Sequence, residues 1–265
     1  GHVDLDGLAS QLGDDVAAVY FENPSYLGQI EPQAAAIAAA ARKAGAETIV
    51  GVDPVSLGIL KPPGQYGADI VVGSIQPLGI HMNCGGGLGG FIASRDEPRY
   101  AYEYPTLMIS IAETIKDETS FSLALFHQSS YGSREEGKDW TGNSVYLWAI
   151  ASAAYMSLLG PEGFRELGEL VIQRANYCAG LLDDIDGVRV TPRSGFFKEF
   201  VVNFDDAGKQ VAGINNALLD KDIYGGLDLS KSFPDLGQSA LYCVTEVHSR
   251  ADLEYLADAV REACR

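Results

Sequence analysis

Cysteine and histidine are scarce in this sequence, with four residues of each type among 265. The cysteines form no CxxC pair, and the histidines form neither an HExxH nor an HxH pattern. Zinc sites and disulfide frameworks depend on such close spacings. We therefore predict no metal site. We expect the four cysteines to be reduced and mostly buried, because a free cysteine behaves as a small hydrophobic residue.

Basic residues are also few, with 19 Lys and Arg against 36 Asp and Glu and a formal net charge of −17. Such a chain repels nucleic acids and anionic membrane surfaces, so we expect neither as a partner. No uninterrupted apolar run reaches the about 20 residues that a membrane-spanning helix needs. The first residues lack the basic start and apolar run of a secretory signal, which predicts a cytoplasmic location.

Support for hydrolase or simple acid–base chemistry is missing too. Ser56, Ser74 and Ser130 stand outside any GxSxG context and have no recognisable histidine partner. Several carboxylates could act as acids or bases, but their spacing specifies nothing, and solvated faces and caps explain them more simply. These carboxylates are Glu22, Glu31, Asp69, Asp183, Asp184, Asp205 and Asp206.

The first part of the chain alternates predicted helices and buried strands. One short helix is expected within 1–15, ending at Gly13, and another over 32–44. The continuous apolar run over 16–21 predicts a buried strand, and 48–52 predicts a second one. A third and a fourth strand are expected over 68–73 and 90–94. This β-α-β alternation predicts a parallel sheet.

The second part begins with a connecting and contact-making region over 95–142, with one strand expected over 120–126. Apolar residues at helical spacing predict a long, well-buried helix over 143–159, ended by Gly160 and Pro161. A smaller α+β domain should follow, and we place the domains at 1–142 and 143–265. Its predicted elements are helices over 162–183, 211–221 and 252–264 and strands over 187–190, 198–204 and 241–245.

Two polar residues directly follow predicted strands, at the edge where a parallel sheet presents groups to a ligand. Asp53 either faces a protonated ring nitrogen or another cation, or closes an Asx turn before Pro54. Asn23 precedes Pro24 at the equivalent place, where the turn interpretation is favoured.

A glycine cluster over 85–90 could bind an anion through its backbone N–H groups. The cluster lacks the lysine and hydroxyl of a P-loop, and it leads into a predicted strand where a dinucleotide-binding turn leads into a helix. Tight turning or contact with a partner chain is therefore favoured over anion binding.

Longer motifs resemble a known family. The run DPVSLGILKPPGQYGADIVVG at 53–73, followed by QPLGI at 76–80, is similar to subunit 1 chains of the glycine dehydrogenase (decarboxylating) family, the P-proteins of the glycine cleavage system. Shorter stretches agree, and the resemblance runs nearly end to end. They include NPSYLG at 23–28, SLLGPEG at 157–163, KEF at 198–200 and GGLDL at 225–229.

This resemblance implies an α/β fold of the type I pyridoxal-phosphate enzymes. The chain would hold part of the large parallel-sheet domain and a C-terminal α+β domain. It would also lack the N-terminal portion that family members carry, whether naturally or not, and an unpaired sheet edge is expected at its start.

The resemblance further implies that this chain is not the catalytic half. A pyridoxal-phosphate enzyme needs a lysine amine to hold its cofactor as an aldimine. No lysine occurs from Pro62 to Ile115, and Pro77 takes the place of the catalytic sister subunit's lysine. A proline ring cannot form a Schiff base. We therefore expect no catalytic residue and no bound cofactor here, with Asp53 as a relic of the carboxylate that faces the pyridine nitrogen.

The expected partners are a lysine-bearing sister subunit, which holds pyridoxal phosphate, and the lipoyl H-protein. Together they would decarboxylate glycine and transfer its aminomethyl group. The alternative is a scaffolding or regulatory pseudoenzyme of the same fold that no longer cleaves glycine. An independent decarboxylase using Lys61 or Lys116 is disfavoured, because neither residue lies in the loop before the glycines.

Two segments, 80–84 and 126–143, depart from the family pattern. The resemblance places them near the subunit junction, so they leave the identity of the substrate open. With Asn23, which follows the first predicted strand, the candidates for interface or pocket residues are Asn23, His81, Asn83, Thr141 and Asn143.

Overall fold

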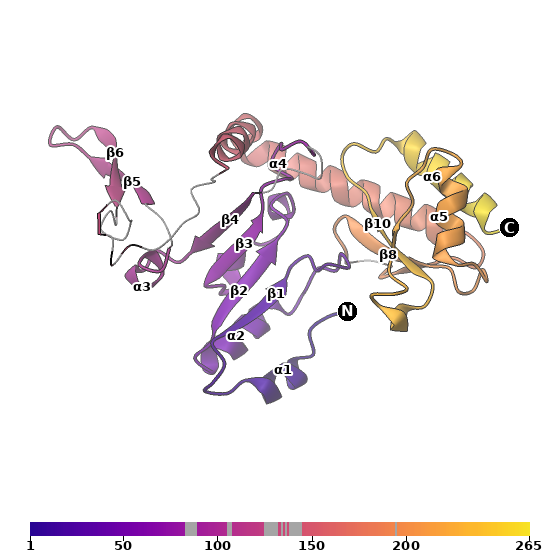
Figure 1. The fold of residues 1–265 in the computed structure, drawn as a ribbon, viewed down its shortest axis with the longest axis horizontal. Helices are drawn as coiled ribbons and strands as arrows, with labels where there is room; N and C mark the ends of the chain where they lie inside the picture. The colour runs from indigo at the N-terminus through magenta and orange to yellow at the C-terminus, as the bar shows by residue number, and fades with distance from the viewer. Residues whose placement is uncertain are drawn as a thin grey trace. The chain divides into compact units, whose positions relative to one another are not determined.

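The computed structural model describes residues 1–82, 89–104, 108–124, 132–133, 135, 137, 145–193 and 195–265. The chain divides into two compact units, one formed by Gly1–Ile92 with Trp148–Arg265 and the other by Ala93–Leu147. Figure 1 traces both units. The domain boundary that we place at residue 142 stays a prediction.

The first unit contains a four-stranded sheet in the order β1-β2-β3-β4. The strands are β1 (Ala18–Glu22), β2 (Glu47–Val52), β3 (Ile70–Ser74) and β4 (Gly90–Ser94). Helices α1 (Leu5–Gln11) and α2 (Ala34–Lys43) accompany them. The β1–β2 and β2–β3 pairs are parallel, which confirms the prediction. Ile37 of α2 and Val50 of β2 are fully buried in one core cluster, so the helix covers the sheet.

A second sheet in the same unit has the order β7-β8-β10-β9, and its neighbouring strands are antiparallel. The strands are β7 (Arg189–Thr191), β8 (Glu199–Asn203), β9 (Leu227–Asp228) and β10 (Ser239–Cys243), and the helices are α5 (Val211–Leu219) and α6 (Arg250–Ala263). Phe200, Leu218 and Val260 belong to the core between this sheet and its helices. Figure 1 shows α5 and α6 beside the second sheet.

Helix α4 (Tyr146–Asp183) is interrupted at Gly160, whose φ of 61° and ψ of −179° are not helical. The predicted break between two helices is therefore confirmed. The predicted burial of the first helix is wrong for this chain. Only its face bearing Trp148 and Tyr155 packs against a cluster that includes Leu78, and Leu158 on another face is 86% exposed.

The second unit contains α3 (Pro98–Ala101) and an antiparallel hairpin of β5 (Met108–Glu113) and β6 (Thr119–Ala124). Strand β6 matches the strand predicted over 120–126. Strand β5 was not predicted, because its short apolar stretch is interrupted by the polar residue Ser110 and the small residue Ala112. Short 3-10 turns η1 (Ser56–Gly58), η2 (Pro63–Tyr66) and η4 (Pro234–Leu236) complete the described elements.

The loop after β1 is bonded to the segment that enters β8. Ile30 N donates to the carbonyl of Gly195 at 2.8 Å, and Phe197 N donates to the carbonyl of Gly28 at 3.1 Å. Gly28 has a φ of 89°, and a Cβ there would lie 1.8 Å from the Glu199 carbonyl oxygen. Only glycine fits such a close approach, which brings the start of β8 to the carboxyl ends of β1, β2 and β3. In the part of the chain that is described, no helix has the length and apolar character for crossing a bilayer.

Candidate functional site

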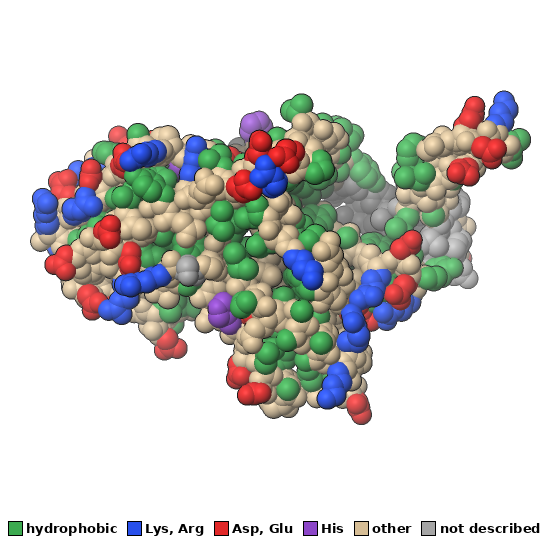
Figure 2. All heavy atoms as spheres, turned by 180° about the vertical axis from the view of Figure 1, so that it is seen from behind, with side chains coloured by type: hydrophobic (Ala, Val, Ile, Leu, Met, Phe, Trp, Pro, Cys, Tyr) green, Lys and Arg blue, Asp and Glu red, His purple; other side chains and the backbone are tan. Residues whose placement is uncertain are grey.

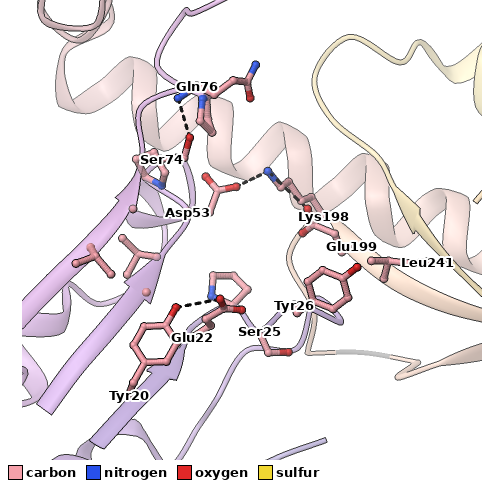
Figure 3. A pocket seen from close by; sticks show the side chains of 17 residues that line it. Tyr20, Glu22, Ser25, Tyr26, Asp53, Ser74, Gln76, Lys198, Glu199 and Leu241 are labelled. Atoms are coloured by element: carbon pink, nitrogen blue, oxygen red, sulfur yellow. Dashed lines mark hydrogen bonds and ion pairs between the residues drawn. The ribbon is translucent and has the colours of Figure 1, made fainter. Parts of the chain in front are cut away.

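A cavity of about 470 Å³ opens at the carboxyl ends of β1, β2 and β3. Ligands of open α/β sheets bind at this edge. The strands contribute Glu22, Asp53 and Ser74 to its wall, and the second sheet contributes Lys198 and Glu199. Figure 3 shows Lys198 reaching from the second sheet toward Asp53.

Asp53 is held firmly at the end of β2. Its Oδ1 accepts a hydrogen bond from Val55 N at 2.8 Å, and its carbonyl oxygen accepts one from Ser56 Oγ at 2.7 Å. Its Oδ2 forms an ion pair with Lys198 Nζ. Both interpretations of Asp53 therefore hold. The side chain closes a turn through Val55 N, and the cation that it faces is the ammonium group of Lys198 in the same chain.

Lys198 sits among acidic groups in a mostly enclosed place. Its side chain is 20% exposed, that of Asp53 is 14% exposed, and Glu199 Oε1 lies 3.7 Å from Lys198 Nζ. Burial lowers the pKa of Lys198, but the charges of Asp53 and Glu199 outweigh burial and hold this pKa above its ordinary value. The amine is therefore protonated at neutral pH, and its lone pair is not available as a nucleophile.

Burial also acts on the carboxylate beside it. Loss of water around Glu199 raises the pKa of this side chain, and the positive charge of Lys198 opposes the rise. Cys243 Sγ lies 3.5 Å from Glu199 Oε1. Loss of water around the thiol, together with the charge of Glu199, raises the pKa of Cys243 to about 12. The thiol is therefore neutral at pH 7.

Of the three described cysteines, Cys178 is buried, Cys264 is half-buried and Cys243 is exposed, and all three are free. The expectation of mostly buried cysteines is thus wrong at Cys243. Its position explains the exposure, because Cys243 stands at the end of β10 on the side facing the cavities, whereas its neighbour Tyr242 faces the core.

A second cavity of about 680 Å³ lies beyond the same ion pair. Asp53, Pro77 and Lys198 line both cavities. His81, one of the predicted pocket residues, lines the second cavity together with Glu246. The structure therefore brings Asp53, Pro77 and His81 into one region around Lys198.

Asn23 has a different position. Its side chain is buried, and its Oδ1 accepts a hydrogen bond from Glu31 N at 3.0 Å. The residue thus holds the turn after β1 and does not line the first cavity. The predicted residues Asn83, Thr141 and Asn143, Cys84 and most of the glycine cluster lie outside the described residues.

Two of the carboxylates that we assigned to solvated faces or caps, Glu31 and Asp69, are buried. Glu31 accepts hydrogen bonds from Val3 N and Gln33 N, both at 2.8 Å. Asp69 accepts one from Thr48 N at 2.9 Å. Both satisfy backbone donors, so they act as caps inside the protein. Among the described residues, no three His, Cys, Asp or Glu side chains cluster as a metal site requires.

Sequence reasoning missed Lys198 as a site residue. Its motif, KEF at 198–200, served only as part of a family resemblance. A single lysine before a strand gives no local signal of function, because only the contact of Gly28 with the start of β8 places it opposite Asp53.

The fold defines the class of protein. A NifS-like protein superposes with a TM-score of 0.65 at 17% identity, over 98% of this chain and 64% of its own. A sphingosine-1-phosphate lyase from Burkholderia pseudomallei gives a TM-score of 0.66 at 18% identity, over 99% of this chain and 55% of its own. As predicted, the chain has the type I fold of pyridoxal-phosphate enzymes.

The family is narrower than this class. The family model "Glycine cleavage system P-protein" matches residues 3–260. A solved structure of glycine decarboxylase (P-protein) of the glycine cleavage system, in inhibitor-bound form, has a TM-score of 0.85 at 33% identity, over 96% of this chain and 56% of its own. The chain belongs to the glycine cleavage system P-protein family.

Curated relatives agree with this assignment. A probable glycine dehydrogenase (decarboxylating) subunit 1 from Staphylothermus marinus is 36% identical over 100% of this chain and 57% of its own length. The protein of the same name from Saccharolobus solfataricus is 36% identical over 100% of this chain and 56% of its own length. The chain thus spans little more than half the length of these relatives.

The described residues do not fit pyridoxal phosphate, the cofactor that the fold class implies. Such a site needs a lysine that forms the aldimine and an acidic partner for the ring nitrogen. Pro77 offers no amine, and the amine of Lys198 is protonated. Asp53 already uses both carboxylate oxygens, one for Val55 N and one for Lys198.

Proposed function

We propose that this chain is the non-catalytic subunit of a glycine dehydrogenase (decarboxylating). In this proposal it completes the enzyme around a sister subunit whose lysine carries pyridoxal phosphate. The complex acts in the cytoplasm, decarboxylates glycine and passes the aminomethyl group to the lipoyl H-protein. This chain itself holds no cofactor and contributes positioning and shielding of the partner's site.

The main support for the proposal is that the first cavity lies where a ligand would bind but lacks the groups that would hold the cofactor. It has the position of a ligand site at the end of a parallel sheet, yet Asp53 is neutralised by Lys198 and Pro77 stands beside it without an amine. A chain with this cavity is suited to complete a neighbouring site rather than to run the reaction alone. The relatives' name, subunit 1, supports a complex.

The exposed apolar surface on the first half of α4 supports binding to a protein partner. No charged residue occurs over 148–161, and Ile150 and Leu158 are 65% and 86% exposed. Figure 2 shows hydrophobic side chains gathered over this part of the molecule. The buried core of a protein interface is apolar and poor in charge. The second half of α4 instead carries ion pairs such as Arg165 with Glu169.

A reconstitution experiment tests the proposal. The exchange of labelled bicarbonate into glycine is measured with this chain, with the sister subunit, and with both, each with lipoyl H-protein and pyridoxal phosphate. We expect exchange only when both subunits are present. Full exchange by the sister subunit alone, or by this chain alone, would contradict the proposal.

The second candidate is a scaffolding or regulatory pseudoenzyme of the same fold. The closed Asp53–Lys198 pair also favours it, because such a cavity needs no chemistry of its own. The same experiment separates the two candidates. A chain that binds the sister subunit but leaves the rate of exchange unchanged is a scaffold.

A further inference from the structure

We propose that Lys198 is an internal cation that occupies the place of a cofactor ring at Asp53 and so determines that this cavity rejects protonated pyridines. The inference rests on the proposed non-catalytic role and names the residue that enforces it. In this view Lys198 is a specificity-determining residue of the fold, and not only a partner in an ion pair.

The first support is the fixed position of both partners. Asp53 is tied to its turn by Val55 N and Ser56 Oγ, so its Oδ2 points in one direction. The backbone of Lys198 is equally constrained, because its carbonyl oxygen accepts a hydrogen bond from Val244 N at 2.9 Å. The preceding Phe197 is fully buried. Lys198 is therefore placed opposite Asp53 by the packing around it.

The second support is the local charge. One cation, Lys198, pairs with two carboxylates, Asp53 and Glu199, which leaves a net charge of −1 when all three are ionised. A protonated ring at Asp53 would have to displace the ammonium group or lie beside it, where like charges repel. Without the lysine charge, Asp53 would be free and the local charge would be −2, which attracts a protonated ring.

The third support is the enclosure of the pair. Side chains that are 20% and 14% exposed interact in a medium that screens charge less than water does. The titratable groups that face Lys198 are Asp53, Glu199 and Cys243. Both carboxylates favour its charged form, and the exclusion of a second cation is therefore maintained across the neutral pH range.

Substitution of the lysine tests the inference directly. The probe is pyridoxine, which has the pyridine ring but neither the aldehyde nor the phosphate, and binding is measured by equilibrium dialysis at pH 6 to 7. We expect saturable binding to Lys198→Met and binding to the wild-type chain that is at least tenfold weaker. The matched variant Lys198→Arg keeps the charge and should behave like the wild type.

The double variant Lys198→Met with Asp53→Asn shows whether any gain depends on Asp53. We expect the gain to disappear. Pyridoxine binding by the wild type that equals that of Lys198→Met, no gain in Lys198→Met, or a gain that survives in the double variant would each overturn the inference.

A second measurement covers the case in which Lys198→Met does not fold. Asp53→Asn removes the main charge that stabilises the ammonium form, so burial should then make the amine easier to deprotonate. We expect acetic anhydride at pH 8 to label Lys198 at least tenfold faster in Asp53→Asn than in the wild type, with exposed Lys116 as an internal reference. Equal labelling rates would overturn the inference.

Neither measurement uses glycine, the sister subunit or the H-protein. If the binding results hold and reconstitution fails, only the proposed function is wrong. If reconstitution succeeds and Lys198→Met gains no pyridoxine binding, only the role given to Lys198 is wrong.

Discussion

At the scale of single residues, the cavity depends on one pair whose members come from different sheets. Asp53 could be singled out from the sequence, because an acidic residue after a buried strand of a parallel sheet has a known place. Lys198 could not, because its position depends on the close approach of Gly28 to the start of β8. Residue type and spacing thus located one member of the pair, and tertiary packing supplied the other.

Removing one partner of the Asp53–Lys198 ion pair should destabilise the chain more than removing both partners. Lys198→Met leaves Asp53 without its cation in a mostly enclosed place, and we expect the free energy of unfolding to fall by about 1–3 kcal/mol, since residual exposure weakens the penalty. The double variant with Asp53→Asn should recover most of this loss. Urea denaturation measures both, and a double variant that loses as much as the two single variants combined would contradict the account.

The same pair gives stability a definite pH dependence. Folding raises the pKa of Lys198, so its contribution is fully present below the unfolded pKa of about 10.4. The contribution is lost as the pH rises through the still higher pKa of the folded state. Urea midpoints should therefore run parallel in the wild type and in the double variant up to about pH 10, and above it those of the double variant should fall less steeply. Curves that stay parallel above about pH 10 would count against the ion pair.

Cys243 offers a chemical test at the same place. Its pKa of about 12 leaves very little thiolate at pH 8, whereas an ordinary thiol with a pKa of about 8.5 is partly ionised there. We expect iodoacetamide to label exposed Cys243 more slowly than a free thiol, with a rate that climbs steeply with pH. Glu199→Gln removes a nearby negative charge and should speed the labelling. Mass spectrometry of the peptide checks both, and fast labelling of the wild type at pH 8 would be inconsistent with this environment.

At the scale of elements, the break in α4 was visible in the sequence, and its burial was not. Gly160 followed by Pro161 indicates an interruption, and the helix does break there. Apolar residues on every face predict burial, but they do not say whether the covering atoms belong to the same chain. The exposed side chains of the first half therefore mark the limit of prediction from one sequence.

The conformation of Gly160 gives a matched pair of variants. Gly160 and Gly180 both lie in α4 with no atom near an added Cβ, but only Gly160 has a positive φ, of 61°. With ψ of −179°, this region is nearly exclusive to glycine. Gly160→Ala should lower the free energy of unfolding by about 1–3 kcal/mol, whereas Gly180→Ala should raise it by up to about 1 kcal/mol. Equal effects in urea denaturation would show that backbone strain is not the cause.

The exposed face of α4 should be required for pairing with the sister subunit. Ile150→Glu with Leu158→Glu places two charges on this face, and burying unpaired charges is costly. We expect at least tenfold weaker binding of the sister subunit, with an unchanged circular dichroism spectrum of the isolated chain. Gln173→Glu, on the exposed charged half of the same helix, is the control. Binding that tolerates the double variant would place the interface elsewhere.

At the scale of the whole molecule, the order of elements, the parallel sheet and the α+β domain followed from apolar runs and turn residues. The motifs in the sequence resembled one family, and the P-protein family model matches residues 3–260 of this chain. The relation between the two sheets of the first unit could be seen only in the structure. It places Lys198 against Asp53, so the charge of the Asp53 carboxylate is neutralised. The absence of an aldimine on this chain is the claim on which the proposed function depends.

One measurement tests that claim most directly. This chain and its sister subunit are reconstituted with pyridoxal phosphate, reduced with borohydride, separated and digested, and each pyridoxyl-lysine is mapped by mass spectrometry. The account predicts one stoichiometric adduct on a lysine of the sister subunit and none on Lys198 or any other lysine of this chain. A stoichiometric adduct on Lys198 would contradict it.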